Sequence, residues 1–244
     1  AGLIAISIAK FLGQSWKLTK TQWRATAIIG LCQNSLYLGL TFVGLQWIEA
    51  SLATILASML PLLVTCLDRI LFKKHIKFLG LVGLFLGCCG VIIIMGNRVS
   101  NEIDIRGVIS CVVGVFALAV ATLSLRGASS GENILMIVGL QMLIGSAILT
   151  ISSLFFEVWV IDWSPKILLA FSYSIVVPGL IATWIWFSLI ARIGATEAST
   201  FHFLNPFFGV AVAALILEEP VSLYDYVGVA IVSLGILAVQ ISKR

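Results

Sequence analysis

The stretch ATILASMLPLLVTCLDRILFKKHIKFLGLVGLFLGCCGVIIIMG, residues 53–96, decides the fold. It consists of two apolar runs joined by the basic cluster KKHIK at residues 73–77. The sequence EEPVS, residues 218–222, begins 145 residues after KKHIK and also joins two apolar runs, but it is acidic. One position in two similar segments is therefore basic in the first and acidic in the second.

The composition is that of an integral membrane protein. Of the 244 residues, 60% are hydrophobic and 11% are charged, and the mean hydropathy is +1.13. A soluble domain has about 25% charged residues, so we expect this chain to have the lipid bilayer around it. The net charge of +4 comes from short breaks between apolar runs. A nucleic-acid-binding face needs clustered basic residues, so we expect no nucleic-acid partner. The five cysteines form no CxxC pair, and we predict no metal site and no cofactor.

The apolar runs predict membrane-spanning helices. An α-helix needs about 20 apolar residues to cross a bilayer core of about 30 Å, and in lipid its backbone polar groups must be satisfied internally. The runs are continuous rather than alternating, which predicts an all-α polytopic membrane protein. Eight complete transmembrane helices are expected near residues 25–46, 50–72, 78–96, 107–126, 133–156, 166–191, 194–217 and 222–241. Residues 1–12 are apolar but too short to span, and we expect them to be the end of a further helix.

An ungapped offset of 145 residues relates the two halves of the chain. It aligns residues that shape helices: Pro61 with Pro206, Gly83 with Gly228, and Gly90 with Gly235. Proline bends a helix and glycine lets backbones approach closely, so these six residues predict a shared bend and shared packing in a duplicated bundle.

The offset also sets the expected boundaries of the two copies. The second copy begins near residue 107, which would place the start of the first copy some 40 residues before residue 1. We therefore expect the first helix, and most of the second, to be absent from a ten-helix bundle of two five-helix repeats. The predicted organisation is a first repeat at residues 1–97, an external connector at 98–106 and a second repeat at 107–244.

An odd number of helices per repeat makes the second copy enter the membrane from the opposite side, and the charges fit this. One set of alternate loops holds Lys10, Lys17, Lys20, Arg24, Arg69, Lys73, Lys74, Lys77, Arg126, Arg192, Lys243 and Arg244. The other set holds only Arg98, Arg106 and Lys166. Because cytoplasmic loops gather Lys and Arg, the first set and the C-terminus are predicted to be cytoplasmic. Inverted repeats of this kind are typical of secondary transporters.

The stretch ATEASTFHFLNPFFGVAVAALILEEPVSLYDYVGVAIVSLGILAV, residues 195–239, resembles the second half of the EamA type of the drug/metabolite transporter (DMT) superfamily, and residues 53–96 resemble the same unit. The resemblance implies two inverted five-helix repeats with both termini cytoplasmic. It further implies a central cavity lined by the first, third and fourth helices of each repeat, and export of metabolites such as amino acids, as in YddG-like exporters. Glu218-Glu219-Pro220 departs from the commoner Gly-Glu-Pro turn, and Lys73-Lys74-His75 replaces that turn in the first copy.

Polar side chains inside these helices are the candidate substrate-binding residues, because polar groups in lipid are costly and usually face the bundle interior. The candidates are Gln33, Asn34, Tyr37, Thr54, Ser58, Tyr173, Trp184, Phe187, Ser199, His202 and Asn205. Aromatic walls with amide groups suit a ligand that has a flat apolar part and a polar end. Structural roles stay open, because Ser and Thr often bond their own helix, Gln and Asn a neighbouring helix, and Trp can anchor at the interface.

The predicted function is a secondary transporter that moves small metabolites, amino acids first and aromatic ones among them, out across the cell inner membrane by alternating access. Export of drug-like cations or nucleotide-linked metabolites remains an alternative, as does, from another class, a channel or a membrane-embedded enzyme. The G-x-S-x-G match at residues 127–131 lacks the strand that such a motif needs, so no catalytic residue is predicted. A GxxxG at Gly83–Gly87 is compatible with a monomer or a weak dimer. The coupling mode stays open among uniport, exchange and proton antiport.

Overall fold

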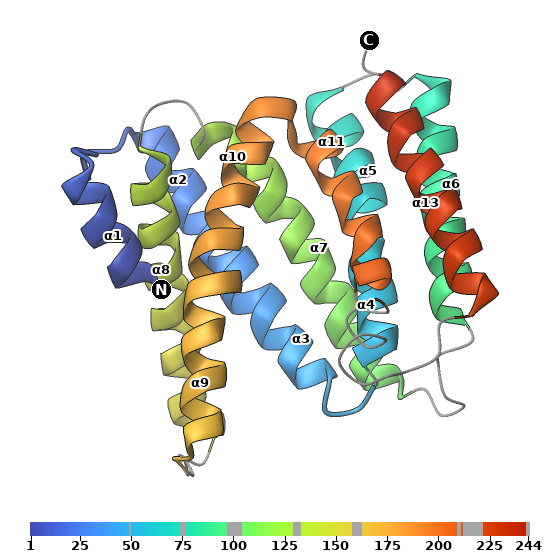
Figure 1. Ribbon diagram of the computed structural model, residues 1–244. Helices are drawn as coiled ribbons and strands as arrows, with labels where there is room; N and C mark the ends of the chain where they lie inside the picture. Colours follow the sequence, from blue (N-terminus) through green and yellow to red (C-terminus); the bar gives the residue numbers. More distant parts are fainter. Residues whose placement is uncertain are drawn as a thin grey trace. The chain divides into compact units, whose positions relative to one another are not determined.

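The computed structural model describes residues 1–48, 50–73, 77–96, 104–128, 133–157, 163–208, 211 and 222–242. These residues are predominantly helical, and no strand occurs among them (Figure 1). Within these described ranges, six helices are long and apolar enough to cross a membrane: Lys20–Gly44, Leu52–Phe72, Ile105–Ala128, Ile134–Phe156, Pro165–Ile193 and Leu223–Ser242. The chain is therefore a polytopic all-helical membrane protein.

The predicted helices can be compared with the observed ones directly. In chain order these are α1 (Gly2–Phe11), α2 (Lys20–Ile29), η1 (Gly30–Tyr37), α3 (Leu38–Gly44), α4 (Ala50–Ser58), α5 (Leu60–Phe72), α6 (Phe78–Met95), α7 (Ile105–Ala128), α8 (Ile134–Phe156), α9 (Pro165–Ser174), η3 (Ile175–Ala182), α10 (Thr183–Ile193), α11 (Ala195–Ser199), η4 (Thr200–Leu204) and α13 (Leu223–Ser242). The short helix expected at residues 1–12 is α1. The run predicted at 78–96 forms α6, which is 18 residues long and belongs with the shorter apolar helices rather than with these six. Of the helix predicted at 194–217, residues 209–210 and 212–217 lie outside the described residues, as do residues 74–76 of KKHIK and 218–221 of EEPVS.

Two of the long helices contain a π-helical segment that the hydropathy pattern did not predict. In the first, η1 continues α2 and leads into α3; in the second, η3 continues α9 and leads into α10. Both long helices begin with a hydroxyl cap, because Thr19 accepts a hydrogen bond from the backbone N–H of Gln22 and Ser164 accepts one from that of Ile167. Such caps satisfy a backbone donor that the helix itself leaves unpaired.

Element boundaries recur at a spacing of 145 residues. The starting residues of α2 and α9 are Lys20 and Pro165, those of η1 and η3 are 30 and 175, and those of α3 and α10 are 38 and 183. The starts of α4 and α11, and of α6 and α13, are the same distance apart. The two halves of the sequence thus share their helix starts and their π-helical segments.

Pro61 and Pro206 each follow an interruption of the helix. The helix ends at Ser58 and starts again at Leu60, so Pro61 is the second residue of α5. Pro206 comes two residues after the 3₁₀ segment η4. Proline has no N–H to donate and its ring crowds the preceding turn, so a break on the N-terminal side of each proline is the expected response.

The described chain divides into two compact units that do not coincide with the sequence halves. Unit 1 comprises Ala1–Gly39 and Val120–Ala195, and unit 2 comprises Leu40–Ala119 and Thr196–Arg244. Each unit therefore takes helices from both proposed repeats, so a repeat is not a separately packed body.

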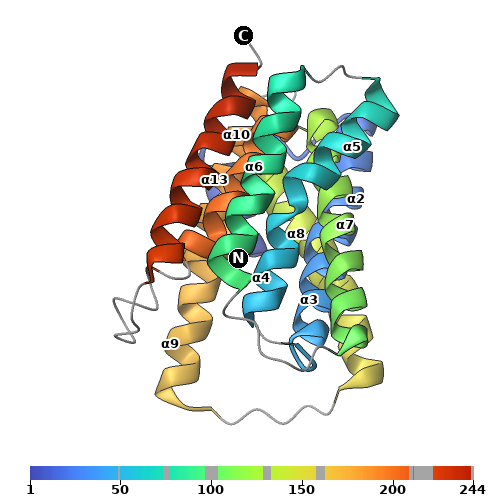
Figure 2. The same ribbon diagram turned by 90° about the vertical axis from the view of Figure 1, so that its right-hand side faces the viewer.

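Unit 2 is organised around the crossing of α6 and α13, which lie side by side (Figures 1 and 2). A Cβ on Gly83 would lie 2.6 Å from the carbonyl oxygen of Gly235, and one on Gly90 would lie 2.8 Å from that of Gly228. Since the lower number of one helix meets the higher number of the other, the helices run antiparallel. Lys77, before α6, and Ser222, before α13, are therefore at opposite ends of this pair.

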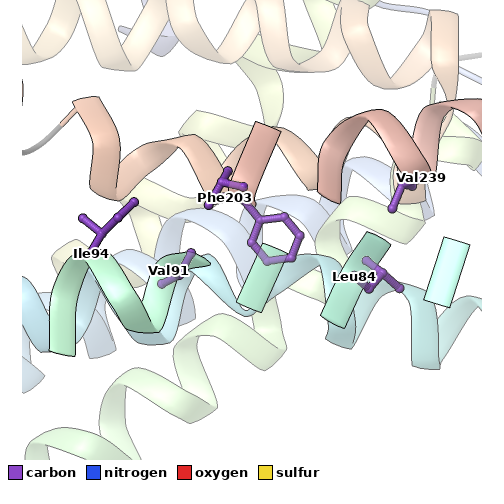
Figure 3. Packing of buried hydrophobic residues seen from close by; sticks show 6 residues of the cluster. Leu84, Val91, Ile94, Phe203 and Val239 are labelled. Atoms are coloured by element: carbon purple, nitrogen blue, oxygen red, sulfur yellow. The ribbon is translucent and has the colours of Figure 1, made fainter. Parts of the chain in front are cut away.

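The apolar core of unit 2 surrounds the same crossing. Phe203 of η4 is completely buried, together with Val232 of α13 and four further residues, Leu84, Val91, Ile94 and Val239 (Figure 3). Its ring lies against Gly87, where a Cβ would come within 2.3 Å of the ring. The 3₁₀ segment η4 is thus fixed on α6 by an aromatic ring that only glycine accommodates.

Unit 1 is built on α8. On α1, a Cβ on Gly2 would lie 3.0 Å from the carbonyl oxygen of Gly139, and on η1 a Cβ on Gly30 would lie 2.6 Å from the carbonyl oxygen of Gln141. A Cβ on Gly145 would lie 2.8 Å from the carbonyl oxygen of Gly30. Backbones meet this closely only where side chains are absent, so glycine sets the position of η1 on α8 and with it the position of the polar residues of η1.

Candidate functional site

The first group of candidate residues lies on η1 in unit 1. Gln33, Asn34 and Tyr37 all belong to this π-helical segment and are all partly buried. Asn34 Nδ2 donates to the side-chain Oε1 of Gln141 on α8 and lies 3.4 Å from the backbone carbonyl oxygen of Gln141. π-Helical turns are frequent at functional sites, and here one presents two neighbouring carboxamides from a membrane-spanning helix.

The polar contacts of η1 extend to a buried hydroxyl. Ser35 Oγ donates to the carbonyl oxygen of Gly145 at 3.1 Å and lies 3.4 Å from that of Gly30. Oε1 of Gln33 and Nε2 of Gln141 are both shielded from solvent and have no hydrogen-bond partner among the described residues. Gln141 was not among the predicted candidates, although it is a lone amide in the apolar run 134–145, and that isolation was a usable signal.

The aromatic candidates of unit 1 differ in how deeply their side chains are buried. Tyr173 on α9 and Trp184 on α10 are 61% and 49% exposed, whereas Phe187 on α10 is 2% exposed. α-Helical spacing alone would place these three residues on one broad face of the helix. The intervening η3 has i→i+5 hydrogen bonds and more residues per turn than an α-helix, so α-helical spacing does not carry across it.

The hydroxyl candidates of unit 2 bond their own helices. Thr54 Oγ1 donates to the carbonyl oxygen of Ala50 and Ser58 Oγ donates to that of Thr54, each at 2.7 Å. Ser199 Oγ donates to the carbonyl oxygen of Thr196 at 2.7 Å. Ser58 and Ser199 are fully buried. All three hydroxyl protons are therefore used in local backbone contacts, and only their oxygen lone pairs remain for another group.

His202 and Asn205 come together in unit 2. Nδ2 of Asn205 lies 3.2 Å from Nδ1 of His202, across the end of η4. Asn205 is exposed within the unit, and His202 is partly buried. Because an amide nitrogen donates, this contact requires the unprotonated Nδ1 of the imidazole.

A second polar contact in unit 2 joins α5 to α11 and was missed by the sequence reasoning. Thr196 Oγ1 donates to Oδ2 of Asp68 at 2.9 Å, and both residues are buried. Nearby, Gln240 Nε2 on α13 donates to the backbone carbonyl oxygen of Glu197 at 3.2 Å. The sequence gave no register between these helices, so the pairs could not be found from spacing.

The site residues are well suited to binding and show no arrangement for metal chemistry. Among the described residues, no group of three or more His, Cys, Asp or Glu is placed to hold a metal ion. The candidate set consists of amides, hydroxyls, aromatic rings and one imidazole. Such groups recognise a ligand by hydrogen bonds and ring contacts without a fixed charge.

The fold is that of a multi-pass membrane protein, and the family match gives its class. The EamA-like transporter family matches residues 1–96 and 105–240. The chain belongs to this family, and it is a small-molecule transporter rather than an enzyme.

Similar proteins agree with this assignment. The uncharacterized transporter YvbV of Bacillus subtilis is 22% identical over 244 residues, which cover all of this chain and 80% of YvbV. A chloroplastic WAT1-related protein of Arabidopsis thaliana is 24% identical, over 98% of this chain and 60% of its own length. A solved crystal structure at 16% identity covers 98% of this chain and 83% of its own, with a TM-score of 0.81, which shows a common fold.

Proposed function

We propose that this transporter exports small neutral or zwitterionic metabolites, amino acids first, across the cytoplasmic membrane. The observation that carries the proposal is the absence of charge from the candidate set. The candidates on η1 are two amides and a phenol, and those at η4 are the imidazole of His202 and the amide of Asn205 directly after it. Phosphorylated cargo needs cationic partners such as Arg or Lys, and no such residue belongs to the set.

The aromatic residues favour cargo with an apolar part. Tyr173 and Trp184 are exposed within unit 1 although they belong to an apolar span. Ring faces and edges bind flat apolar groups, and the amides of η1 bind a polar end. Aromatic amino acids combine both features, and they are the first ligands to be tested.

We further propose two inverted five-helix repeats as the basis of alternating access, with the C-terminus cytoplasmic. The recurrence of helix starts and of π-helical segments every 145 residues supports this. The glycine contacts support it as well, because the 145-residue offset turns the pair Gly83–Gly235 into the pair Gly228–Gly90. A contact set that maps onto itself in this way is the pattern of a two-fold axis, here between antiparallel helices.

Topology can be tested by labelling. Single cysteines at residues 75 and 221, in a background without the five native cysteines, are exposed to a membrane-impermeant thiol reagent in intact cells. The proposal predicts labelling at 221 and none at 75 until the membrane is permeabilised. Equal labelling of both positions in intact cells would rule out the inverted arrangement.

Substrate class is tested with the purified protein. A thermal-shift screen compares amino acids, polyamines, nucleosides and nucleotide sugars, because a ligand that binds the folded state raises its apparent stability. Counterflow in proteoliposomes then measures transport of each stabilising ligand. Stabilisation and counterflow by amino acids support the proposal, whereas stabilisation by nucleotide sugars alone would make nucleotide-linked metabolites the substrate class instead.

Two substitutions test the placement of the binding residues. We expect His202→Ala and Trp184→Ala to raise KM, by about tenfold for the loss of contacts of roughly 1.4 kcal/mol. Trp163→Ala is the matched control, because Trp163 is an exposed tryptophan just before α9 and outside the candidate set. Unchanged kinetics in both test variants would remove His202 and Trp184 from the site.

A further inference from the structure

The contact between Asn34 and Gln141 fixes which atom of each carboxamide faces the other. The nitrogen Nδ2 of Asn34 lies near two oxygen atoms of Gln141, the backbone carbonyl oxygen and the side-chain Oε1. A backbone carbonyl can only accept a hydrogen bond, so the Asn34 atom that faces it has to be the nitrogen. The Gln141 side-chain atom that faces the same nitrogen then has to be its oxygen.

This orientation leaves polar atoms without partners inside a membrane-spanning unit. Gln141 is completely buried, and its Nε2 has no hydrogen-bond partner in the part of the chain that the structure describes. Oε1 of Gln33 is in the same condition. The only hydrogen bonds of the Asn34 side chain among the described residues are those of Nδ2 to Gln141, so its Oδ1 is an unused acceptor. Buried polar groups without partners cost free energy, and a ligand that pairs with them recovers it.

The position of Asn34 is set by packing as well as by the amide contact. A Cβ on Gly145 would lie 2.3 Å from Cβ of Asn34, so the asparagine lies directly over a glycine of α8. Ser35 Oγ donates to the carbonyl oxygen of this glycine. The backbone of η1 is thus held on α8 independently of the Gln141 side chain, and that side chain acts only on how firmly the Asn34 carboxamide keeps its orientation.

We infer that Gln141 is a positioning residue that turns the Asn34 carboxamide oxygen toward the substrate and so gives the transporter a preference for ligands that donate N–H groups. The inference rests on the proposed function and deepens it. An amino acid carries an ammonium group with three N–H donors, which the acceptors Asn34 Oδ1 and Gln33 Oε1 suit. The carboxylic acid that lacks the amino group offers no such donor.

The experiment uses three ligands that differ only in their polar end. Counterflow in proteoliposomes is measured for the amino acid of the panel that the unaltered protein carries fastest, for its deaminated acid and for its decarboxylated amine. The variants are Gln141→Met, which keeps the side-chain length without the amide, and Gln141→Glu, which keeps an oxygen acceptor for Asn34 Nδ2. The matched control is Ser146→Ala, because Ser146 is exposed on α8 and bonds only the carbonyl of Leu143 in its own helix.

In Gln141→Met the Asn34 carboxamide loses its contact with the side-chain oxygen and keeps only the 3.4 Å approach to the backbone carbonyl of residue 141, so its oxygen is held less firmly. KM for the amino acid and the amine is expected to rise about tenfold, on the scale of one lost hydrogen bond to a charged group, with kcat almost unchanged. KM for the deaminated acid is expected to change far less, so the preference for N–H donors falls. Gln141→Glu restores this preference, and Ser146→Ala retains it.

Each outcome of this experiment supports or overturns a stated proposal. An equal change in KM for all three ligands, or a loss of preference in Gln141→Glu equal to that in Gln141→Met, overturns the positioning role. Should Gln141→Met fail to fold, Gln141→Ser takes its place, because its short side chain does not reach Asn34 and the same comparison applies. Absence of counterflow for every amino acid in the unaltered protein would instead reject the proposed function.

Discussion

Two helix crossings in this transporter use glycine in the same way and differ in what surrounds it. At the crossing of α6 and α13 in unit 2, two glycine pairs bring the backbones together, and the surrounding side chains are apolar. At the crossing of η1 and α8 in unit 1, Gly30 and Gly145 do the same, but two amides and a buried serine lie beside them.

The comparison separates packing from recognition. Helices in lipid have no hydrophobic driving force between them, so close packing and interhelical hydrogen bonds hold them together. The crossing of α6 and α13 needs only the first of these. The crossing of η1 and α8 contains more polar groups than it pairs, and this surplus indicates a role beyond packing.

The largest effect is expected where packing alone acts. In Gly235→Ala, the new Cβ would lie 2.6 Å from the carbonyl oxygen of Gly83 and 2.7 Å from the backbone nitrogen of Gly87. Overpacking against backbone atoms requires the helices to separate, and we expect a loss of about 3 kcal/mol in the free energy of unfolding, at the upper end of the usual range. Unfolding in mixed detergent and SDS measures it.

Gly96→Ala is the matched control, because Gly96 ends the same helix α6 and a Cβ there meets nothing within 4 Å. It should leave stability within about 0.5 kcal/mol of the unaltered protein, as is usual for surface changes. Similar losses in Gly235→Ala and Gly96→Ala would mean that the crossing is not held by glycine contacts.

The second substitution, Gly145→Ala, acts on the other crossing. We expect a smaller loss of stability, about 2 kcal/mol, because a single glycine pair joins η1 to α8. The new Cβ also displaces Asn34, so KM should rise together with the loss of stability. A variant that loses stability but keeps its KM for amino acids would show that η1 takes no part in binding.

The crossings also show what the sequence could predict. The glycine and proline positions predicted the helix features that recur in the two halves, because these residues act through the backbone and occur at the same offset of 145 residues in the sequence. The amides Gln33 and Asn34 stood out as polar residues in an apolar run. The π-helical segments could not be recognised from the sequence, because η1 and η3 are as apolar as the helices that they continue. Hydropathy does not show which carbonyl oxygen accepts the hydrogen bond of a given backbone N–H.

Partners on other helices were equally out of reach of the sequence. Gln141 could be noticed as a lone amide in an apolar run, but that it contacts Asn34 follows only from the packing of the two helices. Thr196 and Asp68 are 128 residues apart in the chain. A contact between helices depends on their rotation and vertical position, and neither follows from the periodicity of one helix.

The third prediction concerns a polar contact outside both crossings. Thr196→Val keeps the shape of the side chain but removes the donor to the buried carboxylate of Asp68. We expect a loss of about 1.5 kcal/mol in the free energy of unfolding, as for other hydrogen bonds to charged groups. Thr150→Val on the exposed side of α8 is the control. If the two variants are equally stable, the bond between α5 and α11 contributes nothing.

The smallest effect is a pH dependence at a third glycine crossing, that of α3 and α7 in unit 2, where Gly44 meets Gly107. Asp104, just before α7, accepts hydrogen bonds from the Arg106 side chain and backbone, which lowers the pKa of this exposed carboxyl. The Arg106 guanidinium lies 5.7 Å from the centre of the Trp47 ring.

A carboxyl whose pKa is lower in the folded state stabilises that state above its unfolded pKa, and this contribution disappears as the pH falls through the folded pKa. We therefore expect the melting temperature of the unaltered protein to fall slightly more between pH 6 and pH 3 than that of Asp104→Asn. Because the pair is exposed, the difference between the two proteins should shrink in high salt. If their melting temperatures fall equally between pH 6 and pH 3 in low salt, the pair does not stabilise the start of α7.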